Sequence, residues 1–277
     1  MAYSKYYTHL EEDDIPKGTL AHIKRRLCND YLNARYNVDL QPAWKIGRWL
    51  VPLLGRKKKQ IEESVRHLPT TPGILVDIGC GNGDYLRTAM RLGWEAWGVD
   101  LDPKAVETAR KTGATVLQGG FPDTGLPSAY FDVMTLSHVI EHVHDPLTAL
   151  QEAFRVLKPG GQIWLATPNM ESFGHARFGA DWRGLEPPRH LSILTSYGLK
   201  KVLECVGFIH LTAKPCGAHA RWFYRSSNRI SKGEDPNDSD APDLPLRLRL
   251  AAEIANFRAA QNTSRCETIV VTAKRPK

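Results

Sequence analysis

The sequence predicts an α/β fold in which seven strands form a mostly parallel sheet. From Gly73 onward, short β-type runs alternate with segments of helical periodicity, the pattern of successive βαβ units. The first of these runs, Ile74–Ile78, leads into a glycine-rich turn and then a helix. The chain has 277 residues, of which 42% are apolar, so it is long enough to bury the core of one large domain.

The strands are expected where short apolar runs end at turn residues. In chain order they are Ile74–Ile78, Ala96–Asp100, Thr115–Gln118, Phe131–Leu136, Gln162–Ala166, a sixth strand after Gly207-Phe208, and Glu267–Ala273. Helices are expected at about Tyr85–Leu92, Lys104–Thr112, Leu199–Val206 and Leu246–Ala260. Another should begin with Asp145 as N-cap and Pro146 in its first turn, and stop at Lys158-Pro159-Gly160-Gly161.

Two segments of this domain show no periodicity. Residues 169–192 follow the fifth strand and are rich in Gly, Pro, His, Arg and Trp, which is typical of a loop or lid over a site. Residues 231–245 are polar, acidic and contain proline, so we expect a flexible insertion there.

Charge and composition divide the chain into two parts. Residues 1–68 form a basic, partly apolar N-terminal helical extension, and residues 69–277 form the α/β domain. The extension contains 13 Lys and Arg against 8 Asp and Glu, whereas the rest of the chain contains 24 against 22. Binding to nucleic acid needs cations spread along a groove together with stacking aromatics, so this nearly neutral domain is not expected to bind it.

One part of the extension is both apolar and basic. The aromatic and aliphatic run Trp44–Leu54 is followed directly by Arg56-Lys57-Lys58-Lys59. Such a segment fits a helix that packs on the domain beside a solvated charge run. It also fits an element that lies on an anionic membrane surface.

The cysteines and the first residues of the chain give an expectation for the cellular location of the protein. The five cysteines, Cys28, Cys80, Cys205, Cys216 and Cys266, are far apart and suggest neither a disulfide framework nor a zinc ribbon. The segment Met1–Leu10 lacks the features of a signal peptide, and no run approaches a membrane span of about 20 apolar residues. A cytoplasmic location is therefore expected, with peripheral contact to the inner membrane surface as the alternative.

The glycine-rich turn indicates a nucleoside ligand. Gly79, Gly81 and Gly83 allow a ligand to approach the backbone closely. Asp100 ends the next strand, where a carboxylate can accept both ribose hydroxyls. The glycine spacing differs from the G-x-G-x-x-G of NAD-binding proteins, and Asp77, just before the glycines, suits a ligand that carries an ammonium group. S-adenosylmethionine is therefore favoured over NAD.

Four motifs together resemble the class I S-adenosylmethionine-dependent methyltransferases. They are Val76–Gly83, Gly98–Asp102, Phe131-Asp132-Val133 and Arg155–Gly161. Ser137–Val143 and Trp182–Leu191 resemble the branch that includes ubiquinone-biosynthesis O-methyltransferases and bacterial small-molecule and glycan methyltransferases. The resemblance covers about residues 70–210. It implies a Rossmann-like sheet with helices on both faces and a lid after strand five.

The resemblance also implies roles for individual residues. The methionine part of the cofactor would lie against Gly79, Gly81 and Gly83, with its amino group near Asp77 and its sulfonium facing Ser137 and His138. The nucleoside would contact Asp100, Leu101, Gly120 and Phe121. Many relatives place an acidic residue beside the adenine amino group, and Gln118–Phe121 contains none, which leaves that contact in question. Leu101 could instead belong to the core.

No metal site is predicted, although His138-Val139-Ile140-Glu141-His142 matches the H-x-x-E-H pattern of zinc peptidases. In those peptidases the pattern lies on one helix, whereas here it follows a β-run directly. Some ubiquinone-pathway relatives are reported to bind a divalent ion at Glu-x-x-Glu-His, and His138 replaces the first Glu. His142 is expected to be packed or hydrogen-bonded in the loop.

The function implied is O-methylation of a small molecule, glycan or lipid-linked intermediate. A hydroxyl acceptor needs a base, and His190 in the lid is the candidate because the pKa of histidine lies near neutrality. A methyltransferase for nitrogen or carbon acceptors is the alternative. A binding protein that retains the fold without catalysis, or one that holds nucleic acid, is the alternative of another class. The sequence does not indicate an oligomeric state.

Overall fold

The computed structural model describes residues 19–215, 217, 219–238 and 242–277. The segment Met1–Leu10 and residues 239–241 of the predicted flexible insertion lie outside these residues. The chain divides into two compact units, with the division between Thr135 and Leu136, inside one strand.

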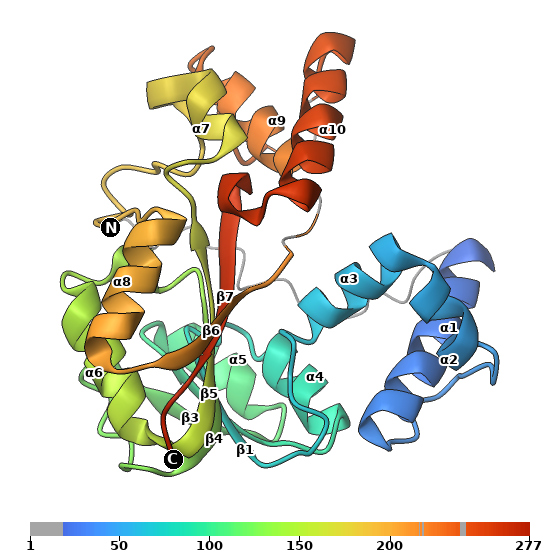
Figure 1. Cartoon of the computed structure of the whole chain (residues 1–277), viewed down its shortest axis with the longest axis vertical. Coiled ribbons are helices and arrows are strands. Elements are labelled where there is room, and N and C mark those ends of the chain that lie inside the picture. Colours follow the sequence, from blue (N-terminus) through green and yellow to red (C-terminus); the bar gives the residue numbers. More distant parts are fainter. Residues whose placement is uncertain (1–18, 216, 218, 239–241) are drawn as a thin grey trace. The chain divides into compact units, whose positions relative to one another are not determined.

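The structure confirms the predicted seven-stranded α/β sheet (Figure 1). The strands are β1 Ile74–Ile78, β2 Glu95–Asp100, β3 Thr115–Gln118, β4 Phe131–Ser137, β5 Leu157–Pro168, β6 Ile209–Ala213 and β7 Thr268–Lys274. Their order in the sheet is β3-β2-β1-β4-β5-β7-β6. β1, β2 and β3 pair in parallel, and β7 runs antiparallel to both β5 and β6.

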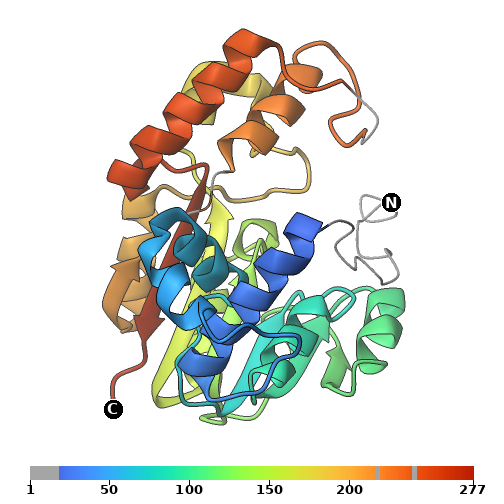
Figure 2. The ribbon, with the colours of Figure 1, turned by 90° about the vertical axis from the view of Figure 1, so that its right-hand side faces the viewer.

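The first unit contains five described helices. They are α1 Thr19–Tyr36, α2 Gly47–Leu53, α3 Gly55–Ser64, α4 Asp84–Arg91 and α5 Pro103–Arg110. α1 packs against α2, around a small core of Tyr31, Val51 and Ile61 (Figure 1, Figure 2). The Tyr36 hydroxyl donates to the Leu68 carbonyl, and both side chains join the cluster that contains β1 and α4, so the extension is anchored to the α/β core.

A close approach behind the glycine-rich turn explains one glycine of β2. A Cβ atom at Gly98 would lie 2.7 Å from both the Cys80 sulfur and a Leu86 methyl carbon. Any side chain there would displace α4 from the sheet. Cys80 is buried and fills this space, as a small apolar residue would.

The second unit carries the remaining described helices. They are α6 Pro146–Val156, α7 Phe173–Phe178, α8 Ser196–Val206, α9 Ala220–Ile230 and α10 Leu246–Gln261. Asp145 caps α6 as predicted, because its carboxylate accepts from the Leu147 N–H at 2.9 Å. α6 contacts β5 and α8, while α9 lies between α7 and α10 in contact with both (Figure 1, Figure 2).

Three local features differ from the expectations. The helix that begins at Pro146 ends at Val156, close to the predicted stop, but β5 begins at Leu157 and not at Gln162, so residues 158–161 belong to this strand, which pairs along its second half with β7. The lid segment contains α7, capped by the Ser172 hydroxyl, because its buried partners stabilise a helix too short to show periodicity. α9 was not predicted at all.

One cysteine is in a disulfide, although the cysteine spacing suggested no disulfide framework. Cys28, Cys80 and Cys205 are free, whereas Cys266 is disulfide-bonded. Within the ranges that the structure describes, no helix has the length and apolar character needed to cross a bilayer.

Candidate active site

The loop after β1 adopts a conformation that requires glycine. Gly79, Gly81 and Gly83 have φ angles of 69°, 54° and 86°, which side-chain-bearing residues rarely adopt. The N–H of Gly79 donates to the Val99 carbonyl at 2.8 Å, which binds the loop to the end of β2. A Cβ atom at Gly83 would lie 3.0 Å from the Ala109 Cα, so this glycine also lets α5 pack closely.

Asp100 is bound to this loop through its carboxylate. Its Oδ2 accepts from the Gly81 N–H at 2.8 Å, and its Oδ1 accepts from the Asp102 N–H at 2.9 Å. Each oxygen keeps a second lone pair, because a carboxylate has about four acceptor positions. The two bonds therefore fix the orientation of a group that can still accept from a vicinal diol.

Leu101 lies in solvent beside a glycine. Its side chain is 62% exposed, so the alternative that it belongs to the core is wrong. A Cβ atom at Gly120 would lie 3.2 Å from a Leu101 methyl carbon, and the Gly119 N–H donates to the Asp100 carbonyl at 3.0 Å. The ends of β2 and β3 thus bring Leu101 and Gly120 together next to Asp100, with the half-buried Phe121 following.

Asp77 is buried and has one oxygen without a partner. Its Oδ1 accepts from the Thr135 hydroxyl at 2.7 Å and pairs with Arg66, while no group of the described residues bonds its buried Oδ2. Burial raises the pKa of Asp77, and the nearby Arg66 guanidinium opposes that rise. An unpaired buried carboxylate oxygen is costly, and a ligand ammonium would satisfy it.

Sequence reasoning missed Arg66. This residue follows α3, and its guanidinium lies over the Tyr85 ring, 3.6 Å from the ring centroid, where it also donates to the Thr135 hydroxyl at 2.9 Å. Its φ of 49° is unusual for a residue with a side chain. No local pattern marks it, because its partners come from β1, α4 and β4.

In the second unit, Ser137 is the last residue of β4, one residue beyond the predicted end of the strand, and His138 follows it. Ser137 is half-buried and His138 is exposed, with a φ of 55°. The His138 N–H donates to the Ala166 carbonyl at 2.9 Å, and its ring Nδ1 lies 3.0 Å from Glu141 Oε1.

Glu141, His142 and His190 form one cluster. Atoms of these three residues that could ligate a metal all lie within 4.8 Å of one another, and the two imidazole rings meet edge to face. Glu141 is fully buried and also accepts from the Thr167 hydroxyl at 3.0 Å. Burial raises its pKa, but the hydrogen bond from His138 and the charges of His138 and His142 outweigh burial and lower it. Residues 140–142 form a 3₁₀ turn, so the zinc-peptidase helix is not formed.

Both histidines of this cluster are oriented by backbone carbonyls. His142 Nδ1 lies 2.9 Å from the Arg189 oxygen, as expected for a hydrogen-bonded loop residue, and His190 Nδ1 lies 2.7 Å from the Gly184 oxygen. A carbonyl can only accept, so each Nδ1 carries the proton when the ring is neutral, and each Nε2 keeps its lone pair. Burial lowers the pKa of His190, which favours the neutral ring.

The lid is fixed at two places. The N–H groups of Leu191 and Ser192 donate to the Glu141 carbonyl at 2.7 and 3.2 Å. At the other end, Glu267 of the second unit accepts from the Trp182 indole at 3.0 Å and from the Gly174 N–H at 2.7 Å. Burial raises the pKa of Glu267 to about 7.

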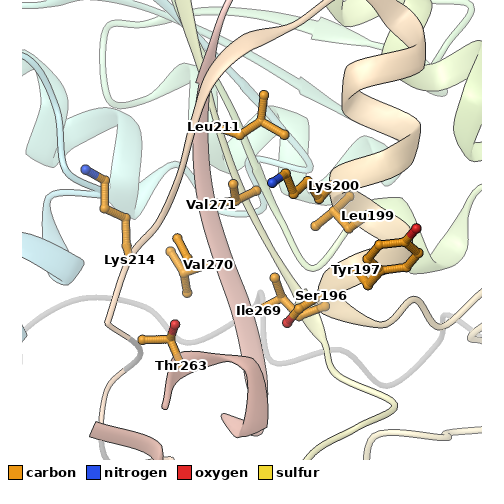
Figure 3. A pocket seen from close by; sticks show the side chains of 11 residues that line it. Ser196, Tyr197, Leu199, Lys200, Leu211, Lys214, Thr263, Ile269, Val270 and Val271 are labelled. Carbon is orange, nitrogen blue, oxygen red and sulfur yellow. The ribbon is translucent and has the colours of Figure 1, made fainter. Parts of the chain in front are cut away.

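A separate pocket lies beside the sheet edge. It has a volume of about 310 Å³ and lies between the start of α8 and strands β6 and β7 (Figure 3). Aliphatic side chains, among them Leu199, Leu211 and Val271, form much of its lining. It contains none of the predicted site residues.

Residues 53–212, more than half of the chain, match a family model described as a methyltransferase domain. The ubiquinone biosynthesis O-methyltransferase of Cereibacter sphaeroides is 38% identical over 116 residues, which are 39% of this chain and 47% of that protein. The Xanthomonas oryzae pv. oryzae protein of the same name is 32% identical over 124 residues, 42% of this chain and 52% of that protein. The chain thus spans about half the length of the curated relatives it matches.

Solved structures share the fold at lower identity. An S-adenosylmethionine-dependent methyltransferase from Mesorhizobium loti is 20% identical, with a TM-score of 0.51 over 78% of this chain and 98% of that chain. A Haemonchus contortus phosphoethanolamine N-methyltransferase 2, in complex with S-adenosyl-L-methionine, is 13% identical, with a TM-score of 0.54 over 90% of this chain and 56% of that chain.

Proposed function

We propose that this chain, a member of the methyltransferase-domain family, transfers a methyl group from S-adenosylmethionine to a hydroxyl group of a small molecule, glycan or lipid-linked intermediate. The orientation of His190 is the observation that supports oxygen as the atom that accepts the methyl group. Because its Nδ1 is held by a carbonyl, the neutral ring has its lone pair at Nε2, which lies 3.7 Å from Glu186 Oε2, and burial lowers the pKa of the ring. An alcohol needs such a base, since its proton must leave as the methyl group arrives.

The residues of the first unit fit the cofactor. S-adenosylmethionine supplies a methyl group activated on a sulfonium. We assign its ammonium to Asp77, directly or through water, because the Oδ2 of this carboxylate has no hydrogen-bond partner among the described residues. The ribose hydroxyls would donate to the fixed carboxylate of Asp100, and the adenine would lie against Leu101 and Gly120, with Phe121 at its edge. The glycine-rich loop lets the methionine part approach the backbone.

The residues of the second unit are assigned to the reacting end. Ser137 and His138 would face the sulfonium from the end of β4, and Glu141 would hold the His138 ring through its 3.0 Å contact. Positioning the acceptor in line with the breaking bond supplies much of the rate in a displacement of this kind. The lid residues would exclude water from the acceptor.

Replacement of His190 tests the proposed base. His190→Ala should lower kcat by about 10²- to 10⁴-fold, the usual contribution of a positioned general base. Its affinity for S-adenosylmethionine, measured by calorimetry, should stay within about twofold, because general-base catalysis acts on the acceptor proton. His175→Ala is the matched control, since the His175 Nδ1 makes the same kind of contact, 2.7 Å from the Met170 carbonyl, outside the cluster.

Three outcomes would contradict this assignment. Full activity of His190→Ala would show that His190 is not the base. Loss of affinity for S-adenosylmethionine would show that His190 has a structural role. Activity that is abolished by a chelator and restored by a divalent ion would assign the Glu141, His142 and His190 cluster to a metal instead.

The pH profile separates oxygen acceptors from the alternative nitrogen or carbon acceptors. With His190 as base, kcat/KM should rise through a pKa below the ordinary value of 6.5, because burial lowers the pKa of this ring. A profile that follows the pKa of an amine substrate would favour N-methylation. A protein that binds S-adenosylmethionine but transfers no methyl group to any acceptor of a metabolite screen would favour the non-catalytic alternative.

A further inference from the structure

Helix α2 presents apolar side chains to solvent instead of burying them. Its only buried residues are Gly47 and Val51, through which it packs on α1. A Cβ atom at Gly47 would lie 2.1 Å from the Leu27 carbonyl oxygen, which shows how closely the two helices approach. The large apolar residues Trp49, Leu50 and Leu53 of α2 are 75%, 38% and 81% exposed. The flanking residues Trp44, Ile46 and Leu54 are 38%, 56% and 46% exposed. Such a concentration of exposed apolar residues marks an interaction surface.

A run of cations borders this surface. Residues 45–59 include Lys45, Arg48 and Arg56–Lys59 but no Asp or Glu. Arg48 forms an ion pair with Asp30 at 2.8 Å, so its charge has a partner within the fold. Arg56–Lys59 form the first turn of α3, where the helix dipole disfavours positive charge. Although Glu62 and Glu63 follow Lys58 and Lys59 on α3, the position of the four cations at the helix start does not stabilise the helix.

A groove adjoins the exposed side chains. It has a volume of about 490 Å³ and lies between α1, α2 and α3. Leu27, Val51 and Leu54 line its apolar part, and Lys24, Arg56 and Lys57 also border it. An apolar interior beside three cations matches an acyl chain attached to an anionic headgroup.

We propose that α2 and the first turn of α3 bind the chain to the surface of an anionic lipid bilayer. Trp49, Leu50 and Leu53 enter the boundary between headgroups and acyl chains, while Arg56–Lys59 contact the headgroup phosphates. The groove receives part of one lipid chain. The exposed side chains favour the membrane-surface interpretation of this segment over the packing interpretation, because a helix that only packs on the domain would bury the side chains that α2 exposes.

Flotation with vesicles tests the proposal. The full chain should bind vesicles of phosphatidylglycerol and phosphatidylcholine, bind pure phosphatidylcholine much more weakly, and be released as salt screens the cations. A Lys58→Ser/Lys59→Ser variant should lose about fivefold in partitioning per cation, from the usual attraction of one cation to an anionic surface. A Trp49→Glu/Leu53→Glu variant should lose at least about tenfold, because both side chains lose burial in the bilayer.

Helix α10 provides the matched control. Leu246 and Phe257 on it are 70% and 66% exposed, comparable to Trp49 and Leu53. Leu246→Glu/Phe257→Glu should leave vesicle binding unchanged. Since all four side chains are exposed, both double variants should retain the circular dichroism and the cofactor affinity of the parent protein.

The proposal is overturned if the wild-type chain does not bind anionic vesicles at low salt. It is also overturned if the α2 variant binds like the parent, or if the α10 variant loses binding, which would assign the contact to α10. None of these results depends on methyl transfer, so failure of the proposed reaction is distinguishable from failure of the lipid surface.

Discussion

Arg66 offers a direct test of how the buried carboxylate of Asp77 is tolerated. The two side chains form an ion pair, in which Asp77 is 1% and Arg66 is 15% exposed. Arg66→Met keeps an unbranched chain but removes the charge, so a buried carboxylate loses its counter-ion. Breaking a buried pair in this way costs about 3–5 kcal/mol of unfolding free energy. Arg66→Met/Asp77→Asn should recover most of this loss, because no charge is then left unpaired.

The loss in Arg66→Met should depend on pH, and its sign follows from the pKa of Asp77. Burial raises this pKa, and removing the opposing guanidinium raises it further. A carboxyl group with a higher pKa in the folded than in the unfolded protein is easier to deprotonate after unfolding. The variant should therefore be least impaired below the unfolded value of about 3.9, and its loss should grow as the pH rises toward the folded value.

Urea denaturation of the parent, both single variants and the double variant at pH 5 and pH 8 measures these effects. S-adenosylmethionine should stabilise the parent more than either variant that contains Asp77→Asn, because the ammonium loses a charged acceptor. A loss below about 1 kcal/mol in Arg66→Met at pH 8, or a double variant no more stable than the single one, would refute the role given to the pair.

Two further predictions concern the nucleoside and the lid. Asp100→Ala should weaken S-adenosylmethionine binding by about 1.5–3 kcal/mol, or about 10- to 150-fold. If a folded variant has the same affinity by calorimetry, Asp100 does not bind the ribose. Glu267 has a pKa raised by burial from 4.5 to about 7, so its protonated form is favoured in the fold. The free energy of unfolding should consequently fall by up to about 3 kcal/mol as the pH rises through this window, and a Glu267→Leu variant that keeps the same slope would contradict this assignment.

Local sequence patterns were sufficient to predict the strands, the turn and the helix cap around the proposed cofactor site. The strand before the glycines, the cap at Asp145 and the carboxylate at Asp100 each depend on residues within a few positions of one another. Their conformations are set by short-range steric and hydrogen-bonding preferences. The three glycines have the positive φ angles that a close approach to the backbone requires, so the motif and the geometry agree.

Long-range partners could not be predicted in the same way. The sequence gives no sign that Arg66 meets Asp77 and Thr135, or that His142 and His190, 48 positions apart, have rings in contact at 4.8 Å. These pairs depend on how strands and lid are arranged in three dimensions. The exposure of Leu101 was similarly undecided, because an aliphatic residue after a strand is equally compatible with core and surface.

Glu141 uses its main chain and its side chain for different parts of the second unit. Its carbonyl accepts from the lid at Leu191 and Ser192, whereas its carboxylate contacts His138 at the end of β4. A lid that moves away must leave that carbonyl without both partners, which disfavours partial opening at this point. If the segment covers the acceptor as proposed, acceptor entry and the orientation of His138 would be linked through a single buried residue, and by reciprocity a ligand that fixes either one would favour the bound arrangement of the other.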